Sequence, residues 1–225
     1  MFPLNLQEFE NRMRVLNTSN SIANTYLAEL RNVEVQNDRL RFRTNLQRLG
    51  TLMAYEISKT LQFKEKQIQT PLAITSEQTI SDSIVLVSVL RAAVPFMNGF
   101  LEVFDRAEAG FIGAWRKEGT EQIEVALEYS AAPNLDGKTL ILIDPMLATG
   151  KSLVASLNQI LKNGKPASIH LASVIAAPEG IEYLKKNIEV DHQLWTWAVD
   201  EKLNDKSYIV PGLGDAGDLS FGSKL

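Results

Sequence analysis

One stretch, residues 138–153 (KTLILIDPMLATGKSL), constrains the fold of this 225-residue chain more than any other. The apolar run from Thr139 to Ile143 has the length and β-branched content of a buried strand. It ends at Asp144 and Pro145, and a proline cannot donate to a strand ladder because it has no N–H. A short loop then leads into residues 153–161, whose apolar spacing is typical of a helix packed on a sheet. The order strand, acid, loop and helix predicts an α/β unit that binds a phosphorylated ligand through loop N–H groups and the helix N-terminus.

Two phosphate-binding interpretations compete for this stretch. Gly150-Lys151-Ser152 after a strand suggests a P-loop, but that motif requires a glycine at position 145, which is proline here. In the second interpretation, Asp144 accepts hydrogen bonds from ribose hydroxyls and residues 146–152 surround a single 5′-phosphate. We favour the second, although the stretch taken alone is equally compatible with an ordinary βα unit that has no ligand.

Composition excludes several classes of function. The net charge is −4 and there is no long basic run, which argues against nucleic acid or an anionic membrane as the main partner. The absence of cysteine excludes disulfides, thiolate catalysis and cysteine metal sites, and a chain with only His170 and His192 cannot form a histidine-rich one. Both histidines lie in apolar, strand-like runs, so we expect structural roles for them. No apolar stretch has the length of a membrane span and the N-terminus lacks a signal-peptide pattern, so we expect a cytoplasmic location.

The remaining pattern predicts a single α/β domain over 1–225. It divides into a largely helical N-terminal part (1–61), an arm or loop (62–82), a core of sheet and helices (83–200) and a C-terminal part (201–225). Apolar residues at helical spacing predict helices over 20–30, 38–61, 96–103 and 178–186. Apolar or alternating runs predict strands over 83–90, 109–117, 123–129, 168–177 and 192–200.

Two arginines are candidates for binding an anion. Arg91 directly follows the strand predicted over 83–90, at the edge where α/β sheets bind ligands, and a guanidinium can hold phosphate in bidentate fashion. The alternative for Arg91 is an ion pair with a nearby acid. Arg116, beside Lys117 near the tip of a predicted hairpin, either covers an anion or is solvated.

Arg39, Arg41 and Arg43 alternate along the start of a predicted helix. Alternate helix positions diverge by about 200°, so the three guanidinium groups cannot form one cluster. We therefore expect them to lie on a solvated face.

The last informative stretch is the glycine-rich loop over 208–218 (YIVPGLGDAGD). Gly212, Gly214 and Gly217 let the backbone approach a planar ligand closely, because glycine has no side chain. Backbone N–H and C=O groups in such a loop match the alternating donors and acceptors on the edge of a pyrimidine. The alternative is a flexible tail, which fits less well because the loop lies between hydrophobic residues and leads to Phe221.

Four segments, in this order, resemble the uracil phosphoribosyltransferases: Val89-Leu90-Arg91-Ala92, residues 144–150 (DPMLATG), residues 176–180 (AAPEG) and residues 208–218. The similarity also includes residues 41–43 and 51–56, so it runs through most of the chain. The resemblance implies a type I phosphoribosyltransferase fold, with a central parallel sheet flanked by helices, a hood over 201–225 and a β-hairpin arm. It also implies transfer of the 5-phosphoribosyl group from phosphoribosyl pyrophosphate to uracil, which gives UMP and pyrophosphate in pyrimidine salvage.

The resemblance assigns roles by position. The catalytic candidates are Arg91 and Arg116 at the pyrophosphate, Asp144 at the ribose hydroxyls and Asp215 near both substrates. The donor site comprises Arg91, Arg116, Asp144, Pro145, Met146, Leu147, Ala148, Thr149, Gly150, Lys151, Ser152 and Asp215, and the uracil site comprises Ile209, Gly214, Asp215 and Ala216. Mg²⁺ is the expected cofactor, bound mainly through the substrate pyrophosphate rather than by a set of protein ligands. A homodimer or higher homo-oligomer is expected, while activation by GTP stays open.

Two positions depart from the family pattern and leave a second function open. Ala93 stands where the family usually has glycine, and its Cβ can crowd the pyrophosphate or strain the turn. Lys151 also replaces a glycine, and it either adds a charge to the phosphate site or strains the loop if the position needs a positive φ. If these changes weaken donor binding, the alternative is a catalytically weak paralogue that binds uracil or UMP as a regulatory or interaction protein. Transfer to a different base is a third, weaker option.

Overall fold

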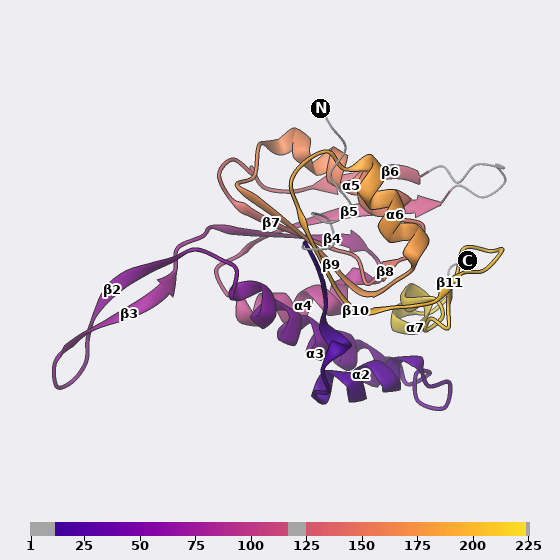
Figure 1. The fold of residues 1–225 in the computed structure, drawn as a ribbon, viewed down its shortest axis with the longest axis horizontal. Coiled ribbons are helices and arrows are strands. Elements are labelled where there is room, and N and C mark those ends of the chain that lie inside the picture. The colour runs from indigo at the N-terminus through magenta and orange to yellow at the C-terminus, as the bar shows by residue number, and fades with distance from the viewer. Residues whose placement is uncertain (1–11, 117–124, 224–225) are drawn as a thin grey trace.

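A computed structural model describes residues 12–116 and 125–223 and has a central sheet between two layers of helices (Figure 1). The strands run in the order β1 (Met13–Val15), β10 (Gln193–Val199), β9 (Ser168–Ala176), β7 (Thr139–Ile143), β4 (Ile84–Leu90), β5 (Glu108–Arg116) and β6 (Val125–Ala131). A short strand, β8 (Met146–Leu147), also pairs with β9. All these pairs are parallel except β5 with β6. The carboxyl ends of the parallel strands therefore meet at one edge, where α/β sheets bind ligands.

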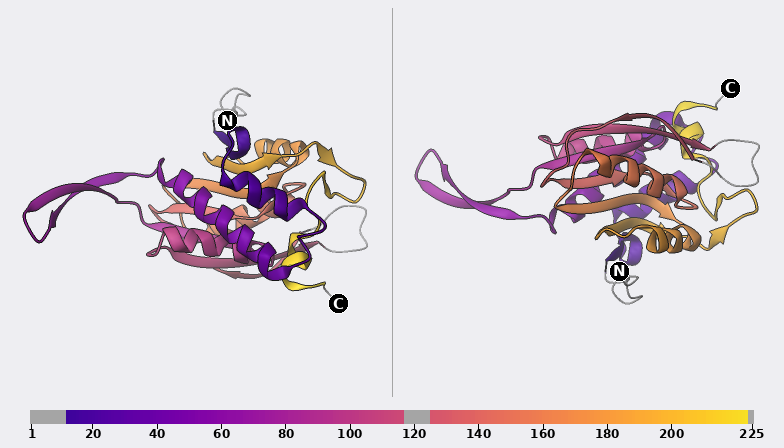
Figure 2. Two further views of the ribbon diagram at one scale, coloured as in Figure 1. Left: turned by 90° about the horizontal axis from the view of Figure 1, so that it is seen from below. Right: turned by 90° about the horizontal axis from the view of Figure 1, so that it is seen from above.

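Helices cover both faces of this sheet (Figures 1 and 2). One layer contains α2 (Ile22–Arg31), α3 (Arg39–Ser58) and α4 (Ala93–Val103), and the other contains α5 (Lys151–Ile160) and α6 (Pro178–Asn187). Successive strand residues face opposite layers, so Leu86 packs in the first core and Val85 and Val87 pack in the second. Both faces are buried, which explains the continuous apolar runs. Across the described ranges, no helix is long and apolar enough to cross a membrane.

The predicted α/β architecture is confirmed, and the helices predicted over 20–30 and 38–61 are α2 and α3. The largely helical N-terminal part also contains a strand that was not expected, because Met13–Val15 form β1 and Leu16–Thr18 form a short 3₁₀ turn. Met13 lies opposite Leu194 of β10, far along the chain. Periodicity within a few residues cannot indicate such a distant pairing, and the part of this prediction before residue 12 lies outside the described residues.

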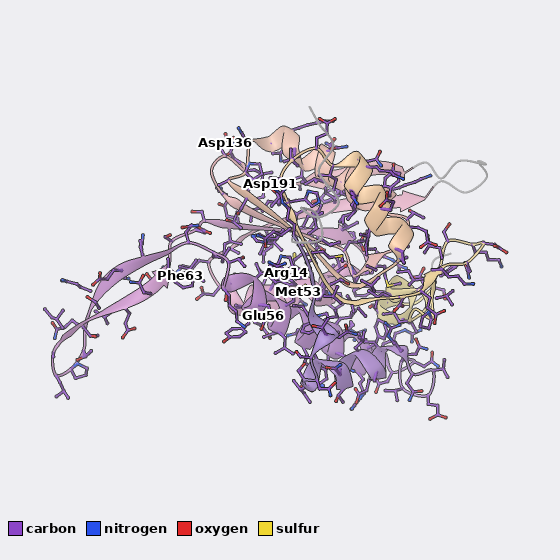
Figure 3. The ribbon with its side chains drawn as sticks, viewed as in Figure 1. Arg14, Met53, Glu56, Phe63, Asp136 and Asp191 are labelled. Carbon is purple, nitrogen blue, oxygen red and sulfur yellow. The ribbon has the colours of Figure 1, made fainter. Side chains whose placement is uncertain are left out.

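The expected arm or loop over 62–82 is a two-stranded arm. Strand β2 (Phe63–Gln69) pairs antiparallel with β3 (Ile74–Ile80), and the pair extends away from the body (Figure 1). Phe63 lies at the base of the arm, and side chains along the arm project outward from both strands (Figure 3). The arm therefore contributes little to the core.

The C-terminal residues lie over the carboxyl edge of the sheet. Strands β11 (Lys202–Leu203) and β12 (Ile209–Val210) form a small antiparallel pair, and α7 (Ala216–Phe221) follows (Figures 1 and 2). Helix α7 is joined to α3 by a hydrogen bond from the Arg43 guanidinium to the Ser220 carbonyl, at 2.8 Å. This arrangement places the glycine-rich loop at the ligand edge.

Both histidines are buried, in keeping with structural roles. Trp195 Nε1 donates to His170 Nδ1 at 3.1 Å, between β10 and β9. Burial lowers the pKa of His170 from 6.5 to about 4, because a charged ring would lose its hydration, and the nearby Asp82 carboxylate opposes this only in part. Burial also lowers the pKa of His192.

We predict that acidification weakens the fold through His170. The unfolded ring has the higher pKa, so the unfolded state binds more protons between pH 6.5 and about 4, and the free energy of unfolding falls as the pH drops through that window. For His170 alone the loss is about 2 kcal/mol by about pH 5. Urea unfolding of the wild type and of His170→Gln at several pH values measures this loss. The variant should have the shallower pH dependence, and equal slopes would contradict the prediction.

Candidate functional site

Backbone hydrogen bonds fix the loop that follows β7. Asp144 Oδ1 accepts from the Met146 N–H at 3.2 Å. The Pro145 carbonyl accepts from the N–H groups of Val174 and Ile175, at 3.0 and 3.1 Å. Proline thus supplies an acceptor at a position where no donor is needed, and β8 then continues the ladder with β9. The loop is held against β9 before it reaches α5.

Helix α5 begins with its N-terminus open toward this loop. Its N-cap is Gly150, with a φ of 76°, and no N-cap side chain binds its first N–H groups, although Thr149 Oγ1 accepts from the Lys151 N–H at 3.5 Å. Those N–H groups have no carbonyl partner within the helix, and the helix dipole favours an anion beside them. A small cavity of about 30 Å³ lies here, lined by Asp144, Met146, Leu147, Ala148, Thr149, Gly150, Ser152 and Leu153. Of residues 146–152, which are predicted to surround the 5′-phosphate, only Lys151 does not line it.

Helix α6 packs closely against residues 144–150, which we call the phosphate loop. A Cβ atom on Gly180 would lie 2.3 Å from the Ala148 carbonyl oxygen, and one on Gly150 would lie 2.8 Å from the Gly180 oxygen. Neither position has room for a side chain. Pro178 starts α6, which needs no N–H at that position. The AAPEG segment is therefore a support for the phosphate loop.

Both departures from the family pattern fit the backbone without strain. Lys151 is the first residue of α5, and Ser207 is the one residue other than glycine with a positive φ within 12–116 and 125–223. Ala93 begins α4 and is fully buried in the core that α4 shares with α3. The condition for strain at Lys151, a positive φ, is therefore not met, and the methyl group of Ala93 packs against protein.

Arg91 connects the two halves of the ligand edge. Its Nη2 donates to Asp218 Oδ1 at 3.0 Å and to the Gly222 carbonyl at 3.3 Å, so the guanidinium lies against α7. The alternative of an ion pair is what the structure has. Both side chains are 38% exposed, and such a pair contributes at most about 1 kcal/mol, so an incoming polyphosphate can compete for Arg91. The backbone of Arg116 ends β5, and its side chain lies outside the described residues.

The glycine-rich loop forms the other half of this edge. Ile209 is buried in β12, Gly214 has a φ of 89°, and Ala216 begins α7. Asp215 caps α7, because its Oδ1 accepts from the Asp218 N–H at 3.0 Å. A cavity of about 450 Å³ lies beside the loop, lined by Val33, Gln36, Asn37, Arg39, Gly214, Asp215, Asp218, Leu219 and Ser223. Gly214 and Asp215 line it, whereas Ile209 and Ala216 do not, and its volume is in the range of small-molecule sites.

Arg39, Arg41 and Arg43 diverge as predicted, but they do not form a plain solvated face. Arg41 makes a bidentate pair with Glu29, at 2.9 and 2.6 Å. Arg43 is half-buried beneath α7, where it donates to Ser220, and Arg39 lines the larger cavity. The expectation is wrong for Arg43 because α7 folds back over α3, which the helical pattern does not indicate.

An ion pair between Arg31 and Asp200 also lies at this edge, and it was not predicted from the sequence. Arg31 Nη1 and Nη2 lie 2.8 and 2.6 Å from the two Asp200 carboxylate oxygens. Asp200 directly follows β10, which is the same order of strand and acid that identified Asp144. That signal was available for Asp200, whereas Arg31, the last residue of α2, has no distinguishing pattern around it.

An α/β sheet with an acid, an anion-binding helix start and a glycine-rich loop at one edge defines a protein that binds a phosphorylated ligand with a planar group. Residues 17–223 match the family model for uracil phosphoribosyltransferase. The uracil phosphoribosyltransferase of Porphyromonas gingivalis is 42% identical over 211 residues, which cover 93% of this chain and 98% of that protein. That of Pyrococcus furiosus is 39% identical over 202 residues, which cover 88% and 85%.

A solved structure has a similar fold over most of the chain. The AQ2163 protein from Aquifex aeolicus is 34% identical, with a TM-score of 0.85 over 95% of this chain and 99% of that one. The family model and the relatives each extend over most of the chain. The chain therefore belongs to the uracil phosphoribosyltransferase family.

We predict that Gly180→Ala disturbs the phosphate loop. The new methyl group overlaps the Ala148 carbonyl, so the loop or α6 must shift, at a cost of about 1–3 kcal/mol in the free energy of unfolding. The KM for the phosphoribosyl donor should rise several-fold, while the KM for uracil changes little. Gly113→Ala is a matched control, because its Cβ would meet only ordinary contacts of 3.4 Å or more. A donor KM equal to that of the wild type would contradict the supporting role of α6.

Proposed function

We propose that this protein transfers the 5-phosphoribosyl group from phosphoribosyl pyrophosphate to uracil and so forms UMP and pyrophosphate. One observation supports the proposal. This chain belongs to the family, and its loop after Asp144 and its glycine-rich loop over 208–218 lie at the same edge of the sheet. The regulator alternative rested on Ala93 and Lys151, and neither position has the crowding or strain that it required.

We assign the donor to the phosphate side of the edge. The 5′-phosphate lies against residues 146–152, where the α5 N–H groups and the helix dipole stabilise its charge. Asp144, half-buried beside this cavity, accepts hydrogen bonds from the ribose hydroxyls. Arg91 leaves Asp218 to bind the pyrophosphate, with Arg116 as its second cation.

We assign uracil to the backbone of residues 209–216. Ile209, Gly214 and Ala216 offer N–H and C=O groups to the edge of the base, and Asp215 lies between the base and the donor. Transfer breaks the bond between C1 of the ribose and the pyrophosphate oxygen, and the pyrophosphate leaves with the electron pair. N1 of uracil then bonds to C1 and loses its proton, for which Asp215 is the one candidate acceptor that we name. Positioning and neutralisation of the departing charge supply the catalysis, and no nucleophilic side chain is needed.

We propose Mg²⁺ as the cofactor, held mainly by the substrate. The edge offers oxygen ligands, the carboxylates of Asp144 and Asp215, which suit a hard cation. Among the described residues, no group of three or more His, Cys, Asp or Glu side chains forms a cage of its own. Asp144 and Asp215 would therefore hold an ion that keeps most of its waters and binds mainly through the substrate pyrophosphate. When bound, Mg²⁺ neutralises charge on the leaving group.

The test of the function is the rate of UMP formation from uracil, phosphoribosyl pyrophosphate and Mg²⁺, with and without GTP. Asp144→Asn should lower this rate about 100-fold, because the ribose loses a charged acceptor, while the far-ultraviolet circular dichroism stays that of the wild type. Asp105→Asn is the control, since Asp105 precedes β5 at the opposite edge and is exposed. No UMP from folded wild-type protein would overturn the function, and a fully active Asp144→Asn would overturn the role of Asp144.

We also propose that the protein is a homodimer in which the arm contacts the partner. An isolated two-stranded hairpin is marginally stable, yet this one exposes large apolar side chains, with Leu72 96% and Ile74 66% exposed. Burial of these side chains in a second copy would stabilise both arms.

Analytical ultracentrifugation tests the arm. The double variant Leu72→Ser, Ile74→Ser should dissociate at least about 10-fold more readily than the wild type, because it loses apolar burial at the contact. Gln67→Ser with Glu77→Ser, one residue on each strand of the same arm, is a polar control. Identical sedimentation of all three proteins would contradict a contact through the arm.

A further inference from the structure

A pair of side chains behind the glycine-rich loop holds one of its residues from two directions. Arg31, at the end of α2, makes a bidentate pair with Asp200, which directly follows β10. Asp200 Oδ2 also accepts from the Gly212 N–H at 2.9 Å, and Arg31 Nη1 donates to the Gly212 carbonyl at 2.9 Å. The acid therefore binds the N–H of Gly212 and the base binds its C=O.

These contacts are shielded from water. The Asp200 side chain is 5% exposed and the Arg31 side chain is 23% exposed. Removing one partner would leave the charge of the other partly buried, together with an unpaired backbone group of Gly212. The Arg31–Asp200 pair is therefore far more tightly held than the half-exposed pair of Arg91 and Asp218.

Gly212 transmits this constraint to both sides of the loop. Its φ is 65°, and a Cβ atom there would lie 2.1 Å from the Ile209 carbonyl oxygen, so the turn from Ile209 to Gly212 is closed upon itself. Gly214, Asp215 and Ala216 follow after a single residue, Leu213. A shift of Gly212 would therefore displace every residue that we assign to uracil.

Arg31 also stands at the start of the opposite wall of the larger cavity. The connection from α2 to α3 begins directly after it, and Val33, Gln36 and Asn37 of that connection line the cavity with Gly214 and Asp215. The same ion pair thus fixes the separation between the two walls.

We propose that Arg31 and Asp200 are positioning residues for uracil, which set the affinity for the base without touching it. The inference rests on the assignment of uracil to residues 209–216. It predicts a selective effect, because the phosphate loop is held separately by β9 and α6. Loss of the pair should weaken the use of uracil and leave donor binding intact.

Steady-state kinetics of Arg31→Lys and Asp200→Asn test this proposal. Each variant keeps the size of the side chain but loses the bidentate pair, and the KM for uracil should rise about 10-fold or more while the donor KM stays within about twofold. The uracil KM of the double variant should lie within about twofold of that of the more impaired single variant, because both residues act through one contact. Arg41→Lys is the matched control, since Arg41 makes an equally bidentate pair with Glu29 away from the loop.

A merely structural pair would give a different result. General destabilisation lowers the amount of active enzyme and so reduces kcat without separating the two KM values. Equal changes in both KM values, or an unchanged uracil KM in folded variants, would overturn the proposal. Amide exchange of residues 209–215 without ligands is the second measurement, and both variants should exchange faster there than the wild type. The two measurements fail separately. A folded wild type without activity overturns the proposed function, whereas unchanged amide exchange in the loop of the variants overturns the positioning role.

Discussion

The parallel hydrogen bonding of β7 with β4 and β9 is the constraint on which the rest of the structure depends. All five residues of β7 are buried, and Ile141 lies between Leu86 of β4 and His170 of β9. Parallel strands need crossover connections, so helices cover both faces and the next loops all emerge at one edge. The ligand site is therefore a consequence of strand pairing in the core.

The two loops at that edge are held by different physical means. Steric contact holds the phosphate loop, because Gly150 and Gly180 leave no space between it and α6. Charged hydrogen bonds hold the base loop, through Arg31 and Asp200 at Gly212. One side of the site can thus change with little effect on the other. Transfer between two substrates depends on such fixed positions, since orientation supplies much of the catalysis.

The sequence predicted what local patterns specify. The strand before Asp144 and the glycine-rich loop are each specified by a few adjacent residues, and the structure has both. Helix α5 begins at Lys151, two residues before the start expected at 153. The sequence did not indicate β1 or the pair of Arg31 and Asp200, whose members are 169 residues apart. Such contacts arise only after the sheet has brought distant segments together. The sequence left open whether Lys151 is strained, because the residue's place inside α5, one position after the glycine with positive φ, depends on where the helix starts.

The central claim is that, at one edge of the sheet, one loop binds the phosphate and the other binds the base. Amide hydrogen exchange in the presence of ligands, measured by mass spectrometry, tests this claim most directly. Ribose 5-phosphate carries only the phosphorylated sugar, whereas UMP carries the base as well. We predict that ribose 5-phosphate slows exchange in residues 146–153 alone, and that UMP slows it both there and in residues 209–216. Protection of the second loop by ribose 5-phosphate, or of neither loop by saturating UMP, would contradict this division of the site.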